Sequence, residues 1–277
     1  MLETILPRND LLKKYIRYFY RFTVDDPNFT RQLMIFPNTG SAIAIYKNTD
    51  FLLVNDRQFL SREKQGSSGL ILHLNRIDPV TIQELGSQKR IGIVFKPLGI
   101  NQFMSEAPGE LIKINNPTLI PLTAFFGELA EFSKGPEMEQ SLQASSLMIE
   151  ELLLKRFKQF TNPVLENAIN EIEKTDKLFK VEDIGLTVGA SPKTMSRLFR
   201  RHIGLSPVEF RKITQFRNAL RNKLADQDAS FTSIAFDNCY YDLPYMIKVF
   251  KEFTGTNIKE LFSKISYAAD KQYVYIG

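Results

Sequence analysis

Four polar side chains between residues 193 and 200 have the types and spacing to bind an anion or a base edge. Lys193, Ser196, Arg197 and Arg200 recur at intervals that place them on one side of a helix. Arg and Lys donate hydrogen bonds to phosphate oxygens and to guanine, and Ser can bond to several base edges. The pattern indicates a helix face that fits the major groove, with Arg201 and His202 facing phosphates or serving a structural role.

Positive charge is concentrated in the same part of the chain. The formal net charge of +5 is too small by itself to imply a nucleic-acid partner. Between Lys193 and Lys223, however, nine basic residues accompany a single acid, Glu209. A solvated helix surface is the simpler interpretation of such a cluster taken alone, so its meaning depends on the elements that carry it.

These elements occur twice in the sequence. The residues that align, at offsets of 50 and then 51, are Ile184 with Ile234, Gly185 with Ala235, Gly189 with Cys239, Ser191 with Asp242, Met195 with Met246, Phe199 with Phe250 and Gly204 with Gly255. Each copy predicts a helix, a tight turn, a second helix capped by Ser191 or Asp242, and a glycine at its end. This order is that of a helix-turn-helix unit.

A long helix is predicted between the two copies. Ser206-Pro-Val-Glu209 has the form of a capping box and begins a helix that continues to about Leu224. A rigid bridge would fix the separation of the two units. If both second helices entered the major groove on one face of a duplex, their sites would lie about 10 base pairs apart.

The strings in this region resemble the AraC family of transcription regulators over residues 165–264. The strings that carry the resemblance are Ser191-Pro-x-x-Met-x-Arg-Leu-Phe-Arg200, Gly204-Leu-Ser-Pro207, Ile234-Ala-Phe, Val249-Phe-Lys and Phe253-Thr-Gly255. In that family the second helices read adjacent major grooves. The positions that match here are Pro192, Lys193, Ser196, Arg197 and Arg200, then Leu243, Pro244, Ile247 and Lys248.

The second copy departs from the family pattern. Cys239 replaces the usual turn glycine and Ile258 replaces a proline, while Leu243, Pro244 and Ile247 replace residues that are usually polar. Apolar side chains can touch a thymine methyl group but cannot form bidentate hydrogen bonds to a base. We therefore expect the first unit to read most of the sequence, with Lys248 giving phosphate contact or limited base contact in the second.

The first half of the chain predicts a β-rich domain. Strands are expected at residues 33–36, 41–46, 51–54, 70–74 and 91–95, separated by turn formers such as Asn48-Thr-Asp50 and Gly66-Ser-Ser-Gly69. The spacing is typical of a small antiparallel barrel or sandwich, and residues 11–22 fit a helix or a strand. Residues 91–104 resemble the effector or dimerisation domains found upstream in such regulators. We expect Phe side chains to fill the core and Lys96 to lie at the rim.

A change to helical periodicity follows Gly135-Pro136. An amphipathic helix is expected at roughly 138–158, whose apolar stripe suits packing within its own domain or dimerisation. Asn162 and Pro163 then indicate the start of a new helix. The predicted fold class is α+β, with a β-rich, barrel-like domain at 1–160 and an all-α domain at 161–277.

Composition and motifs disfavour other classes. His73, His202 and the single cysteine, Cys239, are too far apart to suggest a metal site, and no catalytic motif is recognisable. We expect no enzyme activity and no cofactor. We also expect neither a secretion signal nor a membrane span, so the cytoplasm is the expected compartment.

The expected partners are double-stranded DNA and RNA polymerase. A small-molecule effector and a second copy of the chain are possible further partners. The rival interpretation is a protein-interaction module that has kept the helical fold and lost DNA binding.

Overall fold

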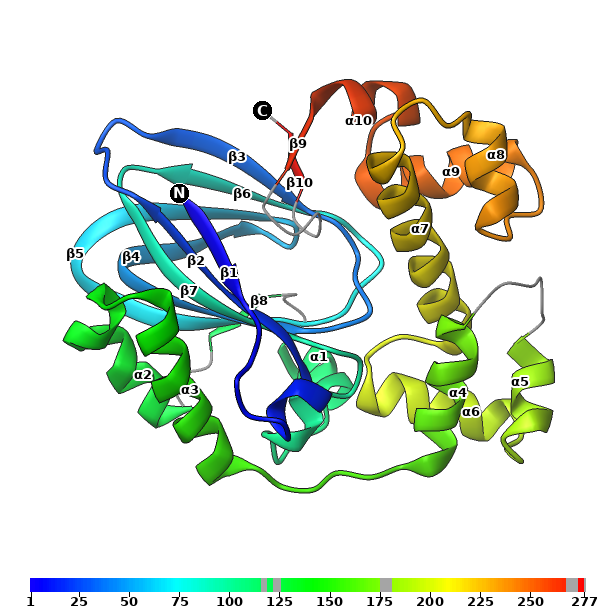
Figure 1. Ribbon diagram of the computed structural model, residues 1–277, viewed down its shortest axis with the longest axis horizontal. Coiled ribbons are helices and arrows are strands. Elements are labelled where there is room, and N and C mark those ends of the chain that lie inside the picture. Colours follow the sequence, from blue (N-terminus) through cyan, green and yellow to red (C-terminus); the bar gives the residue numbers. More distant parts are fainter. Residues whose placement is uncertain (116–118, 122–125, 175–180, 268–273, 277) are drawn as a thin grey trace.

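The structure is a computed structural model that describes residues 1–115, 119–121, 126–174, 181–267 and 274–276 (Figure 1). Within these residues, ten strands form one curled sheet in the order β1-β2-β7-β4-β5-β6-β3-β10-β9, with β8 beside β5. The strands are β1 (Leu2–Ile5), β2 (Ile16–Val24), β3 (Thr30–Ile35), β4 (Ala42–Asn55), β5 (Gln58–His73), β6 (Val80–Leu85), β7 (Gln88–Phe95), β8 (Leu119–Pro121), β9 (Ile265–Tyr267) and β10 (Val274–Ile276).

Helices lie beside this sheet and beyond one end of it (Figure 1). The helices of the N-terminal part are η1 (Leu12–Lys14), η2 (Ile100–Gln102), α1 (Pro108–Asn115), α2 (Gly127–Lys134), η3 (Pro136–Glu139) and α3 (Leu142–Arg156). The C-terminal helices are α4 (Pro163–Glu173), α5 (Val181–Thr187), α6 (Pro192–His202), α7 (Pro207–Ala225), α8 (Phe231–Asp237), α9 (Leu243–Thr254) and α10 (Ile258–Lys264). A curled sheet followed by a helical region confirms the predicted α+β fold class.

Both faces of the curled sheet are buried. Along β4, Ile43 and Ile45 belong to the core that the sheet shares with α2 and α3, whereas Ala44 and Tyr46 pack inside the curl. Successive side chains of a strand point to opposite faces, so one strand serves two cores. The predicted role of Phe side chains is confirmed, since Phe19 and Phe95 are fully buried.

The strands are longer than the sequence predicts. Residues around Asn48 and Gly66–Gly69 were expected to form turns, but they lie within β4 and β5. The register of this pair shifts between Lys47 and Thr49, where Asn48 has a positive φ of 52° and its side chain accepts a hydrogen bond from the Gly66 amide. The turn-forming residues therefore mark a bulge in one long ribbon.

A buried ionic cluster closes part of the space inside the curl. The Glu84 carboxylate is fully buried and pairs with Arg31 and Arg90. The Phe22 ring lies 4.2 Å from the Arg31 guanidinium carbon and 4.5 Å from that of Arg90. Because these residues come from four strands, the cluster ties the curl together.

Helix α3 uses its apolar stripe for packing. Ser141 caps the helix, which begins four residues later than predicted because η3 precedes it. Ile149 and Leu153 are fully buried in the core beneath the sheet. The structure thus favours packing over dimerisation for this stripe.

The C-terminal region contacts the sheet region through side chains, backbone groups and one strand pairing. Arg217 of α7 donates hydrogen bonds to the carbonyl groups of Phe36 and Pro37, at 2.7 and 2.6 Å. Phe36 itself joins the helical core. Strands β9 and β10 were not predicted, and β10 pairs with β3. Asn101 donates to the His202 carbonyl, so the end of α6 is also held.

Candidate nucleic-acid interface

The first helix-turn-helix unit consists of α5, a tight turn and α6. Gly189 occupies the turn with φ of 67°, a conformation that suits glycine. A Cβ atom on Gly185 would lie 2.7 Å from the Ala190 carbonyl oxygen, so the backbone of the turn packs closely against α5 at this position. The Ser191 side chain accepts a hydrogen bond from the Thr194 amide and caps α6, as predicted.

The second unit repeats this arrangement with α8 and α9. Asp242 caps α9 by accepting a 2.7 Å hydrogen bond from the Tyr245 amide. Gly255 ends the helix in the left-handed conformation, with φ of 71°. Cys239 takes the turn position with φ of 55°, although it is not a glycine. The turn geometry is therefore kept without the usual residue.

Helix α7 joins the two units into one body. Its capping box is present, with Ser206 and Glu209 bonding to each other's backbone amides. Near its start, the Phe210 ring lies 5.6 Å from Phe199 of α6. Further along, Phe216 lies 4.9 Å from Phe250 and 5.3 Å from Phe253 of α9. One continuous core therefore fixes the separation of α6 and α9.

Helix α6 has the polar outer face that its sequence predicts. Met195 and Phe199 are buried, which directs the other side outward. Of the predicted residues, Pro192, Lys193, Arg197 and Arg200 are exposed and Ser196 is half-buried. Arg200 also lies 3.9 Å from the Glu209 carboxylate, a distance at which a surface ion pair is weak.

Helix α9 brings only some of its predicted residues to the surface. Pro244, Ile247 and Lys248 are exposed, and Ile247 has 38% of its surface accessible. Leu243 is half-buried and packs against the helical core. The first residue of α9 is therefore turned partly inward, because the turn directs its side chain toward the neighbouring helices.

The basic cluster of the sequence divides into two groups. Several cations of α7 are engaged within the protein: Lys212 bonds to Glu252 of α9, and Lys223 bonds to the Ala229 carbonyl. Arg217 holds the sheet region. The exposed cations of α6, namely Lys193, Arg197, Arg200 and Arg201, remain directed toward solvent. Positive charge available to a partner is thus concentrated on α6.

His202 has a structural role. Its ring lies 4.8 Å from Phe160, and withdrawal from water lowers its pKa, with the neighbouring Arg201 charge adding to this effect. This agrees with the structural alternative given for it. Arg201 is exposed, as a phosphate-facing residue requires.

A groove beside the start of α9 was not predicted. It has a volume of about 560 Å³, and its lining includes Arg211 of α7 together with Tyr241, Tyr245 and Lys248. Tyr241 is 84% exposed. In the sequence, the feature that could have indicated this groove is Tyr241, the aromatic residue directly before the cap Asp242. The groove adds an aromatic and cationic surface to the second unit.

Neither a metal-binding cluster nor a membrane-spanning helix occurs among the residues that the structure describes. No group of three or more His, Cys, Asp or Glu side chains is placed there to hold a metal ion. Among the same residues, no helix has the length and apolar character needed to cross a membrane.

Comparison with known proteins identifies the helical region. Residues 186–264 match the family described as a helix-turn-helix domain. The arabinose operon regulatory protein of Escherichia coli (strain K12) is 26% identical over 147 residues, which cover 49% of this chain and 49% of that protein. The chain thus matches about half the length of this curated relative.

Solved structures of ToxT from Vibrio cholerae are also similar. One crystal form is 14% identical and has a TM-score of 0.47, covering 94% of this chain and 97% of that chain. A second, of ToxT with a bound unsaturated fatty acid, is 14% identical with a TM-score of 0.43, covering 86% and 92%.

Proposed function

We propose that this protein binds specific DNA sequences and regulates transcription, since residues 186–264 match a helix-turn-helix domain. The observation that carries the proposal is the exposed polar face of α6, held at a fixed distance from α9 by α7. Two capped helices on one rigid body suit adjacent major-groove segments about 10 base pairs apart.

The proposed division of labour follows from the two helix faces. Arg197 and Lys193 of α6 would donate to guanine, with Ser196 bonding to a nearby base edge. On α9, Pro244 and Ile247 offer apolar contact to thymine methyl groups, and Lys248 contacts phosphate. The first unit would therefore supply most of the sequence preference.

Selection from a randomised duplex library tests this division. Arg197→Ala should cost about 1–3 kcal/mol of binding free energy and relax the base preference within one half-site. Lys248→Ala should weaken all sequences alike and reduce the salt dependence. Arg62→Ala, an exposed residue of the β4–β5 ribbon, serves as the control. A larger change of base preference with Lys248→Ala would contradict the assignment.

The rival function is that of a protein-interaction module without DNA binding. Measuring DNA binding at several salt concentrations distinguishes the two functions. Binding that rests on phosphate contacts weakens steeply as salt rises, because bound counterions are released. Absence of binding to any genomic fragment at low salt would favour the interaction module.

Three partners belong to this proposal. RNA polymerase is the protein through which a DNA-bound regulator would act. A small-molecule effector would bind the region that contains the sheet, and a second copy of the chain would occupy a second site. The buried stripe of α3 offers little support for dimerisation through that helix.

A further inference from the structure

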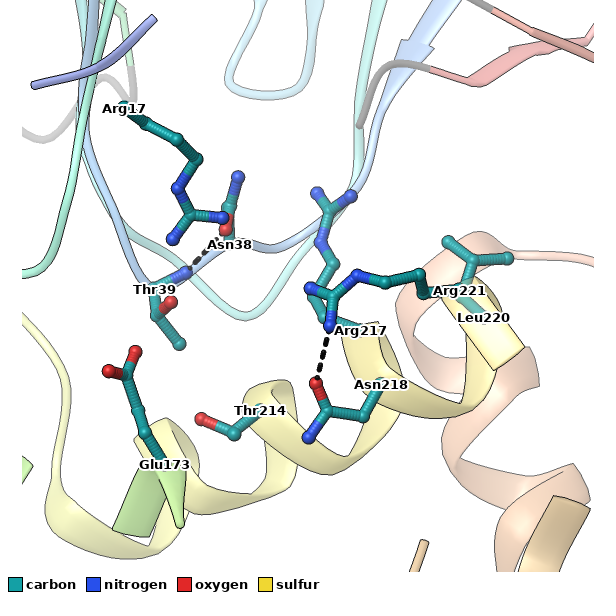
Figure 2. A pocket seen from close by; sticks show the side chains of 9 residues that line it. All are labelled: Arg17, Asn38, Thr39, Glu173, Thr214, Arg217, Asn218, Leu220 and Arg221. Carbon is teal, nitrogen blue, oxygen red and sulfur yellow. Dashed lines mark hydrogen bonds between the residues drawn. The ribbon is translucent and has the colours of Figure 1, made fainter. Parts of the chain in front are cut away.

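A cavity of about 190 Å³ lies at the boundary between the sheet region and the C-terminal helices (Figure 2). It lies where β2, the loop after β3, α4 and α7 come together. Its lining is mainly polar and consists of Arg17, Asn38, Thr39, Glu173, Thr214, Arg217, Asn218, Leu220 and Arg221. Because Leu220 is the single apolar residue in this lining, the cavity suits a small hydrophilic ligand.

Three charged side chains converge on this cavity. Figure 2 shows Arg17 entering from β2, Glu173 from the end of α4 and Arg221 from α7. Among the residues that the structure describes, Arg17 and Glu173 form neither a hydrogen bond nor a contact ion pair with another side chain. Arg221 donates one hydrogen bond, of 3.1 Å, to Asn218.

Arg217 differs from the other cations of the cavity. Two of its nitrogens bond to the carbonyl groups of Phe36 and Pro37 and hold α7 against the sheet region. This anchor fixes one wall of the cavity. Arg17 and Arg221 are the cations that are placed to meet a ligand.

The electrostatics of the cavity favour an anion. Withdrawal from water lowers the pKa of Arg221, and repulsion from the Arg17 guanidinium adds to this effect while Glu173 opposes it. An oxyanion between them would relieve this repulsion and accept charge-assisted hydrogen bonds from both.

Because of Glu173, a ligand in this cavity must also carry a hydrogen-bond donor. Crowding by protein atoms raises its pKa, although Arg17, Arg221 and Lys96 oppose the shift. The residue is exposed, so a ligand in the cavity can reach its carboxylate. An ionised carboxylate only accepts hydrogen bonds and repels a bare oxyanion. A ligand seated here must therefore present a hydroxyl group to Glu173.

We propose that this cavity binds a small oxyanion that carries a hydroxyl group, with the oxyanion between Arg17 and Arg221 and the hydroxyl group donating to Glu173. Hydrogen phosphate and small α-hydroxycarboxylates share this chemistry. The ligand would contact β2 and α7 together, so its binding would stabilise the docking of the helices against the sheet region.

Calorimetric titration of the full chain with matched pairs tests the proposal. At about pH 8, hydrogen phosphate keeps one O–H group whereas sulfate has none, and lactate differs from propionate by one hydroxyl group. The donor-bearing member of at least one pair should bind about tenfold more tightly or better. Preference for hydrogen phosphate identifies a phosphate source, and preference for lactate identifies a hydroxyacid. Absence of binding, or equal binding within both pairs, overturns the proposal.

Variants assign the roles of the three side chains. Arg17→Gln and Arg221→Gln should each weaken the preferred probe about tenfold or more. Glu173→Gln should remove the preference within the pair, because its amide can donate to sulfate as well as accept. Arg62→Gln, on the distant β4–β5 ribbon, should bind like the wild type. Unchanged binding in Arg17→Gln and Arg221→Gln also overturns the site.

The titrations contain no DNA, so they are independent of the proposed regulator function. Circular dichroism of each variant shows whether it is folded. Loss of DNA binding alone would leave the cavity assignment intact, and loss of ligand binding alone would leave the regulator assignment intact.

Discussion

The residue with a positive φ differs between the turns of the two helix-turn-helix units. Cys239 adopts φ of 55° where Gly189 adopts 67°. A non-glycine residue in the left-handed conformation destabilises the folded state by roughly 1–2 kcal/mol. A glycine removes this strain but also gives the unfolded chain more conformational entropy, which offsets part of the gain in stability. Cys239→Gly should therefore raise the free energy of unfolding by up to about 1 kcal/mol in urea denaturation.

The first unit offers the reverse substitution as a control. A Cβ on Gly189 meets no atom within 4 Å, so Gly189→Ala tests the backbone conformation alone. It should lower the free energy of unfolding by about 1–2 kcal/mol. If Cys239→Gly were also destabilising, contacts of the thiol would outweigh the backbone strain.

His73 makes stability sensitive to mild acid. Withdrawal from water, reinforced by the charges of Arg76 and Arg90, lowers its pKa from 6.5 to about 3. The unfolded chain therefore binds the proton first as the pH falls. Stability from this residue is complete above about pH 6.5 and decreases toward pH 3, with a loss of up to about 2 kcal/mol by pH 5.

Denaturation of a His73→Asn variant at several pH values measures this contribution. The variant should lose less stability than the wild type between about pH 7 and pH 5. His202→Asn provides a comparison, since the pKa of His202 is also lowered by desolvation. An identical pH dependence in wild type and His73→Asn would refute the assignment.

At the scale of elements, α7 determines whether the two units behave as one. Phe216 is fully buried and packs against Phe250, Phe253 and Phe36. Phe216→Ala should cost about 3–5 kcal/mol, because it leaves a cavity in a shared core. Amide hydrogens of α6 and α9 should lose protection together in hydrogen exchange.

The exposed Phe236 of α8 supplies the matched control. Its side chain is 83% accessible, so Phe236→Ala should change stability by less than about 0.5 kcal/mol. If Phe216→Ala exposed the amides of α9 alone, the two units would be independent, and a fixed spacing on DNA could not rest on α7.

Helices were easier to predict than strands because their signals are local. The caps Ser191, Asp242 and Asn162 lie beside the helices that they begin, and all three accept the expected backbone hydrogen bond. The length of the β4–β5 ribbon depends on pairing between distant residues. Asn48 and Gly66 have turn chemistry, yet their contact across the ribbon places them in a bulge.

At the scale of the whole molecule, the sequence indicated single faces but not the places where regions meet. The exposed face of α6 was predicted because its spacing lies within one helix. Arg17, Glu173 and Arg221 are far apart in the chain, so no local pattern brings them to one cavity. The same holds for the buried pair of Glu84 with Arg31, whose members are 53 residues apart in the chain.

A glycine of α1 allows α6 to lie close to this helix. A Cβ on Gly109 of α1 would lie 1.8 Å from the Arg200 carbonyl oxygen and 2.8 Å from that of Arg201. Gly109→Ala must therefore move α1 away from α6, which strains the hydrogen bond from Asn101 to His202. We expect a loss of about 1–3 kcal/mol of stability and a larger radius of gyration in solution scattering.

Gly127→Ala is the matched control, because it makes the same glycine-to-alanine change at a position without a steric clash. Gly127 also lies in the first turn of a helix, α2, and a Cβ there meets no atom within 4 Å. This variant should keep the radius of gyration and the stability of the wild type, since alanine favours helix. If Gly109→Ala gave the same scattering and stability as Gly127→Ala, the α1–α6 contact would not hold α6 in place, and the two regions would move independently.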